Sequence, residues 1–113
     1  MSDLRDKILA FDDRTHEVVN VPEWGVDVNV YTMTARDKTR IEKSFMADGG
    51  VADDVYAKIV QMCVCDDNGV RVFTDKDVEA LQDKSAPAIS RIAKVAMRLS
   101  KLTESDEALA EKN

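Results

Sequence analysis

Apolar residues near the N-terminus recur at helical intervals. Leu4, Ile8 and Phe11 are spaced by four and three positions, so they share one face of a helix over residues 3–11. Charged residues fill most of the other positions in this segment. We expect a short amphipathic helix that packs on the core as a satellite.

The spacing changes to strict alternation in the stretch THEVVNVPEWGVDVNVY. Val26, Val28 and Val30 alternate with Asp, Asn and Tyr, which is the period of a strand with one buried face. Pro22 fixes φ at the exit of the preceding valine-rich run, and Gly25 can take the positive φ that such turns need. A β-hairpin that bends at Pro22 to Gly25 is therefore predicted.

Helical spacing returns after the hairpin. Thr34 is a candidate N-cap, and Asp37 three residues later approximates a capping box. Ile41 and Phe45 follow on one face of a charged helix, which is expected to end at the double glycine of positions 49 and 50.

Further helices are expected to form much of the core. A short segment begins at Thr74, with Asp77 as a second capping-box partner. A last long helix is capped by Ser85 and tolerates Pro87 in its first turn. The broad apolar face of the central helix consists of Val55, Tyr56, Ile59, Val60, Met62 and Cys63, and that of the last helix of Ile89, Ile92, Ala96 and Leu99.

These elements predict an α+β fold, a mainly helical small single domain with an N-terminal β-hairpin. The chain has 113 residues, 44% of them hydrophobic and 34% charged, which suits one folded domain with a modest core. We assign residues 1–102 to this domain and residues 103–113 to an acidic tail that frays or docks elsewhere. No apolar run approaches the ~20 residues of a membrane span, the start does not resemble a signal peptide, and two cysteines suit a reducing compartment. A cytoplasmic location is expected.

The stretch CVCDDNG invites a comparison with metal sites. A calcium-binding loop with Gly69 at its sixth position would place Val64 at the first, and valine cannot coordinate calcium. Zinc needs about four ligands, and the other soft ligand besides Cys63 and Cys65 is the distant His16. We therefore expect no metal or cofactor, buried cysteines that act as small hydrophobic residues, and a turn at Asn68-Gly69. The turn could end a helix or close a short hairpin that pairs CVC with VRVF.

Catalytic groups are not apparent in the sequence. His16 is the single histidine and lies in an expected exposed strand, no Ser, Cys or Thr has an evident activating base, and the four glycines are accounted for by turns. An enzyme is therefore the least favoured class.

The net charge of −6 conceals one basic segment. Residues 84–102 contain five basic residues and no acidic one, and four of the basic residues fall together on one side of the last helix. This stripe could bind an acidic partner or phosphate, but we favour a solvated face that attracts the acidic remainder of the chain. Nucleic acid is not the favoured ligand, because no aromatic residues or flexible basic arms accompany the stripe. The stripe consists of Arg91, Lys94, Arg98 and Lys101.

Trp24 is the single tryptophan and lies in the predicted hairpin turn. It could cover the core as a lid or anchor an interface. We favour the lid, and we keep Trp24 and the basic stripe as the candidate partner-binding residues.

The order of these motifs resembles the tail assembly chaperones of long-tailed, lambda-like bacteriophages. The shared pattern is a Val-Pro-Glu-Trp-Gly hairpin with alternating valines, a capped helix, a D-x-x-G-x-x-x-F-T-x-x-D junction and a Ser-capped helix near a short acidic tail. It covers roughly residues 4 to 103.

The resemblance implies a non-enzymatic role in tail morphogenesis. Such chaperones bind the helical tape-measure protein, help to bring tail-tube subunits to it, and are absent from the finished virion. It also implies a host bacterial cytoplasm, a phage or prophage origin and possible self-association. The alternatives are a small nucleic-acid-binding regulator that uses the basic stripe and a structural subunit of the mature tail.

Members of this family are often made in two forms through a −1 ribosomal frameshift. Glu111-Lys112-Asn113 can be encoded GAA AAA AAC, which contains the slippery heptamer A AAA AAC. The sequence therefore permits a longer product, in which the segment from Thr103 onward would be a hinge to a second domain.

Overall fold

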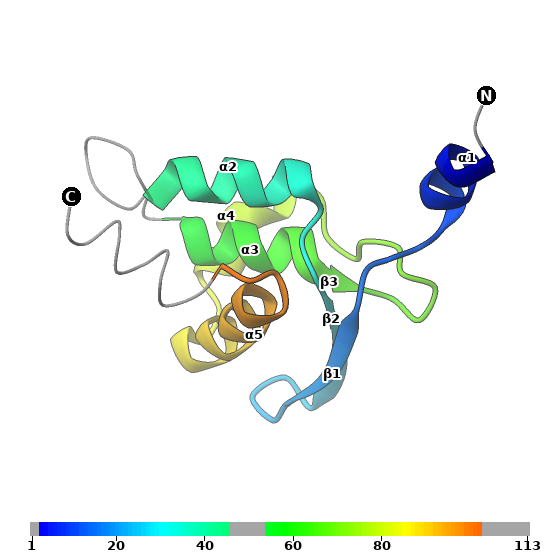
Figure 1. Ribbon diagram of the computed structural model, residues 1–113. Helices are drawn as coiled ribbons and strands as arrows, with labels where there is room; N and C mark the ends of the chain where they lie inside the picture. Colours follow the sequence, from blue (N-terminus) through cyan, green and yellow to red (C-terminus); the bar gives the residue numbers. More distant parts are fainter. Residues whose placement is uncertain (1–2, 46–53, 103–113) are drawn as a thin grey trace.

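A computed structural model describes residues 3–45 and 54–102 of the chain. Its secondary structure confirms the predicted α+β class, with a hairpin followed by helices (Figure 1). The expected helix end at positions 49 and 50 and the acidic tail at 103–113 lie outside the described residues. The elements are α1 (Asp3–Ala10), β1 (His16–Val21), β2 (Val26–Tyr31), α2 (Ala35–Phe45), α3 (Val55–Cys63), β3 (Val64–Cys65), the 3-10 helix η1 (Asp75–Asp77), α4 (Val78–Gln82) and α5 (Ala86–Leu99).

The three strands form an antiparallel sheet in the order β1-β2-β3. β1 and β2 pair from His16 opposite Tyr31 to Val21 opposite Val26, which confirms the predicted hairpin. Gly25 closes its turn with a φ of 66°, a conformation that favours glycine. The predicted alternation of one buried and one exposed face was wrong for part of β2: Val30 is fully buried, but Val26 is 47% exposed and Tyr31 is buried. Burial in β2 increases along the strand because its second half lies against the helices and β3, and its first half lies near the hairpin turn.

The core lies between the sheet and the helices that gather beside it (Figure 1). α3 and α5 pack against each other, and α5 also packs on β1 and β2. The largest fully buried side chains come from the sheet and from three helices, and they are Ile41, Ile59, Ile92, Val21, Val30, Val60 and Cys63. The predicted core faces of α3 and α5 therefore meet, although Tyr56, assigned to the apolar face of α3, is 39% exposed.

Side-chain caps begin the helices at the predicted places. Ser85 Oγ accepts a hydrogen bond from the backbone N–H of Ala88 at 3.4 Å at the start of α5. Thr74 and Asp77 form a capping box at η1. Thr34 Oγ1 accepts from the N–H of Asp37 at 3.2 Å at the start of α2.

Helix α1 forms where expected, but it does not pack on the core. It has no buried residue, and it stands at the opposite end of the molecule from the helical layer (Figure 1). The prediction of a satellite helix was wrong, because amphipathic spacing indicates a helix without indicating what covers it. The exposed fractions are 66% for Leu4, 62% for Ile8, 69% for Leu9 and 70% for Phe11.

The CVCDDNG stretch contains both a helix end and a short hairpin, the two alternatives that the sequence left open. α3 ends at Cys63, and the next two residues form β3, which pairs with β2. The chain then turns tightly, with the N–H of Gly69 donating to the carbonyl of Asp66 at 3.0 Å, and Cys65 forms a bridge with Arg71. Gly69 has a φ of 79°, as the predicted Asn-Gly turn requires.

Across the described residues, none of the helices combines the length and the apolar character needed to cross a membrane.

Candidate functional site

The candidate site is the surface where the basic face of α5 lies against the β1–β2 hairpin. One side of α5 is buried in the core, and this burial determines which of its residues face the hairpin and the solvent. The buried residues of the helix are Ala88, Ile89, Ile92, Ala93, Ala96 and Met97. Leu99, assigned to the apolar face, is only partly buried at the last turn.

Arg91 is held by the hairpin turn rather than directed at solvent. Its guanidinium donates two hydrogen bonds to Glu23, from Nη1 to Oε1 at 2.6 Å and from Nη2 to Oε2 at 2.9 Å. This two-pronged geometry is the strong form of an arginine–carboxylate pair. The hydrogen bonds from Arg91, together with Glu23's own backbone N–H, lower the pKa of Glu23 to about 2.

Arg98 makes a second link between α5 and the hairpin, this time to strand β1. Its Nη2 donates to Oε2 of Glu17 at 2.5 Å, but both side chains are largely exposed, so this pair is weak. Lys94 lies between the two arginines in the sequence, is exposed, and makes no ion pair with any described residue. The α5 surface therefore contacts acidic groups of the same chain, in line with the interpretation that we favoured from the sequence.

Lys101 does not belong to the helical stripe, and its placement there was wrong. α5 ends at Leu99, Ser100 is its C-cap, and Lys101 has a φ of 61°. A residue in this left-handed conformation leaves the helical path, so the 100° spacing no longer applies to it. The stripe on the helix itself therefore consists of Arg91, Lys94 and Arg98.

Trp24 is half-buried in the hairpin turn and packs against the hydrophobic core. This position fits the favoured role as a lid. Its backbone N–H donates to the carbonyl of Val21 at 3.0 Å, which holds the turn closed. Trp24 and Glu23 are neighbours, so the same turn closes over the core and receives Arg91.

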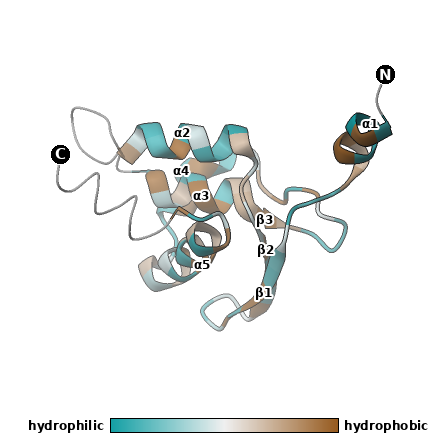
Figure 2. Ribbon diagram, viewed as in Figure 1, coloured by the Kyte–Doolittle hydropathy of each residue, from teal (hydrophilic) through white to brown (hydrophobic). Residues whose placement is uncertain are grey.

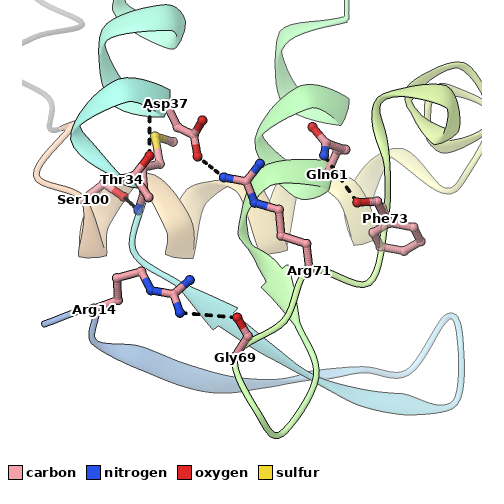
Figure 3. Close-up of polar contacts among 9 residues, drawn as sticks. Arg14, Thr34, Asp37, Gln61, Gly69, Arg71, Phe73 and Ser100 are labelled. Atoms are coloured by element: carbon pink, nitrogen blue, oxygen red, sulfur yellow. Dashed lines mark hydrogen bonds and ion pairs between the residues drawn. The ribbon is translucent and has the colours of Figure 1, made fainter. Parts of the chain in front are cut away.

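A second polar cluster, which sequence reasoning missed, fixes the loop after β3 (Figure 3). Arg71 forms an ion pair with the buried carboxylate of Asp37, at the first turn of α2. Gln61 donates from Nε2 to the carbonyl of Phe73 at 3.3 Å, and so ties α3 to the same loop. The sequence assigned Asp37 to a capping box, but its carboxylate turns instead to a partner 34 residues away. No local pattern signals that pairing.

Arg14 fixes the other side of the same loop. Its Nη2 donates to the carbonyl of Gly69 at 3.3 Å (Figure 3). Its guanidinium lies 5.0 Å from the centre of the Tyr31 ring. The His16 ring stacks on the Tyr31 ring, with 4.6 Å between the two ring centres. These contacts are structural, and they join the loop to the end of the N-terminal arm, which we define as residues 3–13.

The cysteines are free and buried. Burial raises the pKa of the Cys63 thiol to about 12, so the thiol stays protonated and unreactive near neutral pH. Among the described residues there is no group of three His, Cys, Asp or Glu side chains that could hold a metal ion.

Comparison with solved structures gives a match over nearly the whole chain. No protein-family model and no curated protein matches the sequence. Among solved structures, the chain is similar to the tail assembly chaperone of bacteriophage HK97, with a TM-score of 0.64, 22% sequence identity, and coverage of 87% of this chain and 98% of the other. The likeness extends over nearly the whole of both chains. This chain therefore has the fold of a bacteriophage tail assembly chaperone, which confirms at the level of the fold the resemblance predicted from the sequence.

Proposed function

We propose that this protein is a non-enzymatic tail assembly chaperone of a long-tailed bacteriophage or prophage. It binds the tape-measure protein in the host cytoplasm, helps to recruit tail-tube subunits, and is absent from the mature virion. The observation that carries this proposal is the whole-chain likeness to the HK97 chaperone, at a TM-score of 0.64. The ordered motifs of the sequence, from the Val-Pro-Glu-Trp-Gly hairpin to the Ser-capped helix, also support it.

The surface of the chain supports a binding role. Several apolar side chains in the described part of the chain are exposed. They lie on α1, on the hairpin at Val18 and Val26, and after β3 at Val70 and Val72. A chaperone for a long helical protein needs apolar surface of this kind, since it must cover apolar helix faces until the tube forms.

The basic stripe gives little support to the nucleic-acid alternative. Arg91 and Arg98 already contact Glu23 and Glu17, so a phosphate would have to displace two carboxylates of the same chain. Retention on DNA or RNA at low salt that is abolished by Arg91→Glu with Lys94→Glu would revive that alternative.

Co-expression with the tape-measure protein and the tail-tube protein of the same genome tests the proposal. We expect a tagged chain to retain the tape-measure protein on an affinity column and to increase its soluble fraction. A tagged unrelated acidic domain of similar size serves as the control. Failure to bind either tail protein would refute the proposed role.

Mass spectrometry of purified particles separates the chaperone from the structural-subunit alternative. The proposed role predicts that peptides of this chain are present in infected cells and absent from finished virions. Stoichiometric recovery from the virion would instead identify a tail subunit. The same cell sample would show whether a longer product exists with a junction at Lys112-Asn113.

A further inference from the structure

Strand β1 lies at one edge of the sheet, with β2 between it and β3 (Figure 1). Among residues 3–45 and 54–102, no strand pairs with the side of β1 that faces away from β2. The carbonyl of Thr15 accepts from the N–H of Thr32 at 2.9 Å, and this bond sets the alternation of the antiparallel ladder. Every second residue of β1 therefore directs its N–H and C=O away from β2. These residues are His16, Val18 and Asn20, all of them exposed, and we call them the β1 edge.

The β1 edge lacks the features that commonly protect an edge strand from further pairing. Protected edge strands are very short, contain Lys or Pro, or are interrupted by a bulge. β1 has six residues, contains neither Lys nor Pro, and pairs with β2 in a continuous register. Its acidic residue, Glu17, is already paired with Arg98 of α5. A row of outward N–H and C=O groups of this kind can hydrogen-bond to an added strand.

An apolar side chain lies beside these outward backbone groups. Val18 is 59% exposed, whereas Val19 and Val21 of the same strand are buried in the core. Hydrophilic residues account for much of the rest of β1 (Figure 2). A residue opposite Val18 on an added strand would cover its side chain, and an apolar β-branched residue suits that position best.

The hairpin around the β1 edge is acidic. Residues 12–31 contain five acidic residues and one arginine. Asp13, just before β1, and Asp27, opposite Asn20 on β2, make no ion pair with any described residue. An added strand with basic residues near its ends would therefore be favoured by the charge of the hairpin. The acidic residues that are already paired with arginines are Asp12, Glu17 and Glu23.

The same charge disfavours two other occupants of the β1 edge. A second copy of the chain would bring an identical acidic hairpin to this edge, and like charges that face each other across strands destabilise the pairing. The acidic tail of the chain, residues 103–113, contains four acidic residues and one lysine. A basic segment of a different protein is therefore the favoured occupant.

We propose that the β1 edge takes up an extended, basic segment of a partner protein as an additional strand. The backbone groups of His16, Val18 and Asn20 bond to this segment, and one of its apolar residues covers the Val18 side chain. Lys or Arg side chains near the ends of the segment lie against Asp13 and Asp27. The inference rests on the contacts of this chain and does not depend on the proposed role in tail assembly.

An NMR titration of the full chain tests the backbone contact. The probe is an acetylated and amidated peptide with the sequence Lys-Thr-Val-Thr-Val-Thr-Lys. The amide signals of the β1 edge should shift, and their hydrogen exchange should slow about tenfold at a peptide concentration of about ten times the dissociation constant. The amides of Glu17 and Val19 should change less, because they already face β2. An absence of shifts at millimolar peptide, or equal changes in the two sets, would overturn the proposal.

A second peptide tests the charge of the partner. Glutamate in place of both lysines should raise the dissociation constant at least about tenfold, because the peptide then has the same sign of charge as the hairpin. Equal binding of the two peptides would contradict the proposed basic partner.

Variants of Val18 test the position of the contact. Val18→Pro removes an outward N–H without removing a hydrogen bond to β2, and edge strands tolerate proline at such positions. It should abolish the peptide shifts. Val18→Lys keeps the N–H but repels the basic peptide, so it should weaken binding at least about tenfold. Val70→Lys is the matched control, since Val70 is 60% exposed and lies outside β1, and it should bind like the parent chain. Circular dichroism checks that all three variants are folded, and unchanged binding by Val18→Lys would contradict the proposal.

Sedimentation without peptide tests whether a second copy occupies the β1 edge instead. We expect Val18→Pro to leave the oligomeric state of the chain unchanged. Association of the parent chain that Val18→Pro abolishes would show that a second copy fills this edge, and it would overturn the proposal. Both outcomes leave the tape-measure experiment unaffected.

Discussion

Helices α5 and α1 have the same kind of apolar spacing, and their surroundings differ completely. α5 buries six residues against α3 and the hairpin, whereas α1 buries none. The chain that follows α5 is also held, because Ser100 Oγ accepts from the N–H of Met33 at 2.8 Å. Spacing therefore specifies a helix and its apolar side, while long-range contacts decide which surface covers that side.

The largest effect is expected when one isoleucine in each of these two helices is truncated to alanine. Ile92→Ala should lower the free energy of unfolding by about 2–5 kcal/mol, because Ile92 is fully buried in α5. Ile8→Ala should change it by no more than about 0.5 kcal/mol in dilute solution, because Ile8 lies on the exposed arm. Chemical denaturation at low protein concentration measures both. Equal losses would show that the arm packs on its own domain after all.

Loss of the Asp37–Arg71 pair should have the next largest effect. Asp37→Asn removes the charge that compensates Arg71, but Arg71 is 39% exposed, so water screens part of the loss. A destabilisation of about 1–3 kcal/mol is expected by thermal or chemical denaturation. Asp13→Asn, an exposed change in the arm, is the control and should be neutral. A neutral result for both would mean that the pair does not hold the loop to α2.

The two turn glycines allow a finer comparison of the hairpin with the loop after β3. Both have positive φ, so alanine at Gly25 should cost about 1–2 kcal/mol. An added Cβ meets nothing within 4 Å at Gly25 but lies 3.2 Å from Arg14 Nη2 at Gly69. Gly69→Ala should therefore be the more destabilising of the two in equilibrium unfolding. The reverse order would contradict the proposed anchoring of Arg14.

The smallest effect is expected from the Glu23–Arg91 pair and should depend on pH. The folded-state pKa of Glu23 is lowered from 4.5 to about 2, so the pair stabilises the protein above pH 4.5 and loses this contribution as the pH falls towards 2. The difference in unfolding free energy between the parent chain and Glu23→Gln should therefore shrink between pH 6 and pH 2. A constant difference across this range would exclude a contribution from the carboxylate charge.

Local signals account for the parts of the fold that the sequence predicted. Alternating valines with Pro22 and Gly25 specify a hairpin, and Ser85 specifies the start of α5, because each signal acts within a few residues. The ion pairs of Arg71 and Arg91 join residues that are 34 and 68 positions apart in the sequence, so no periodic pattern indicates them. Lys101 was misplaced for a related reason, since the end of α5 depends on contacts with the 32–33 segment that spacing does not encode.

A role in tail assembly can be tested by deleting this reading frame from the genome that encodes it and examining the particles by electron microscopy. We expect filled heads without tails, and restoration of tails when the chain is supplied from a plasmid. Normal tails in the absence of the chain would contradict a role in tail assembly.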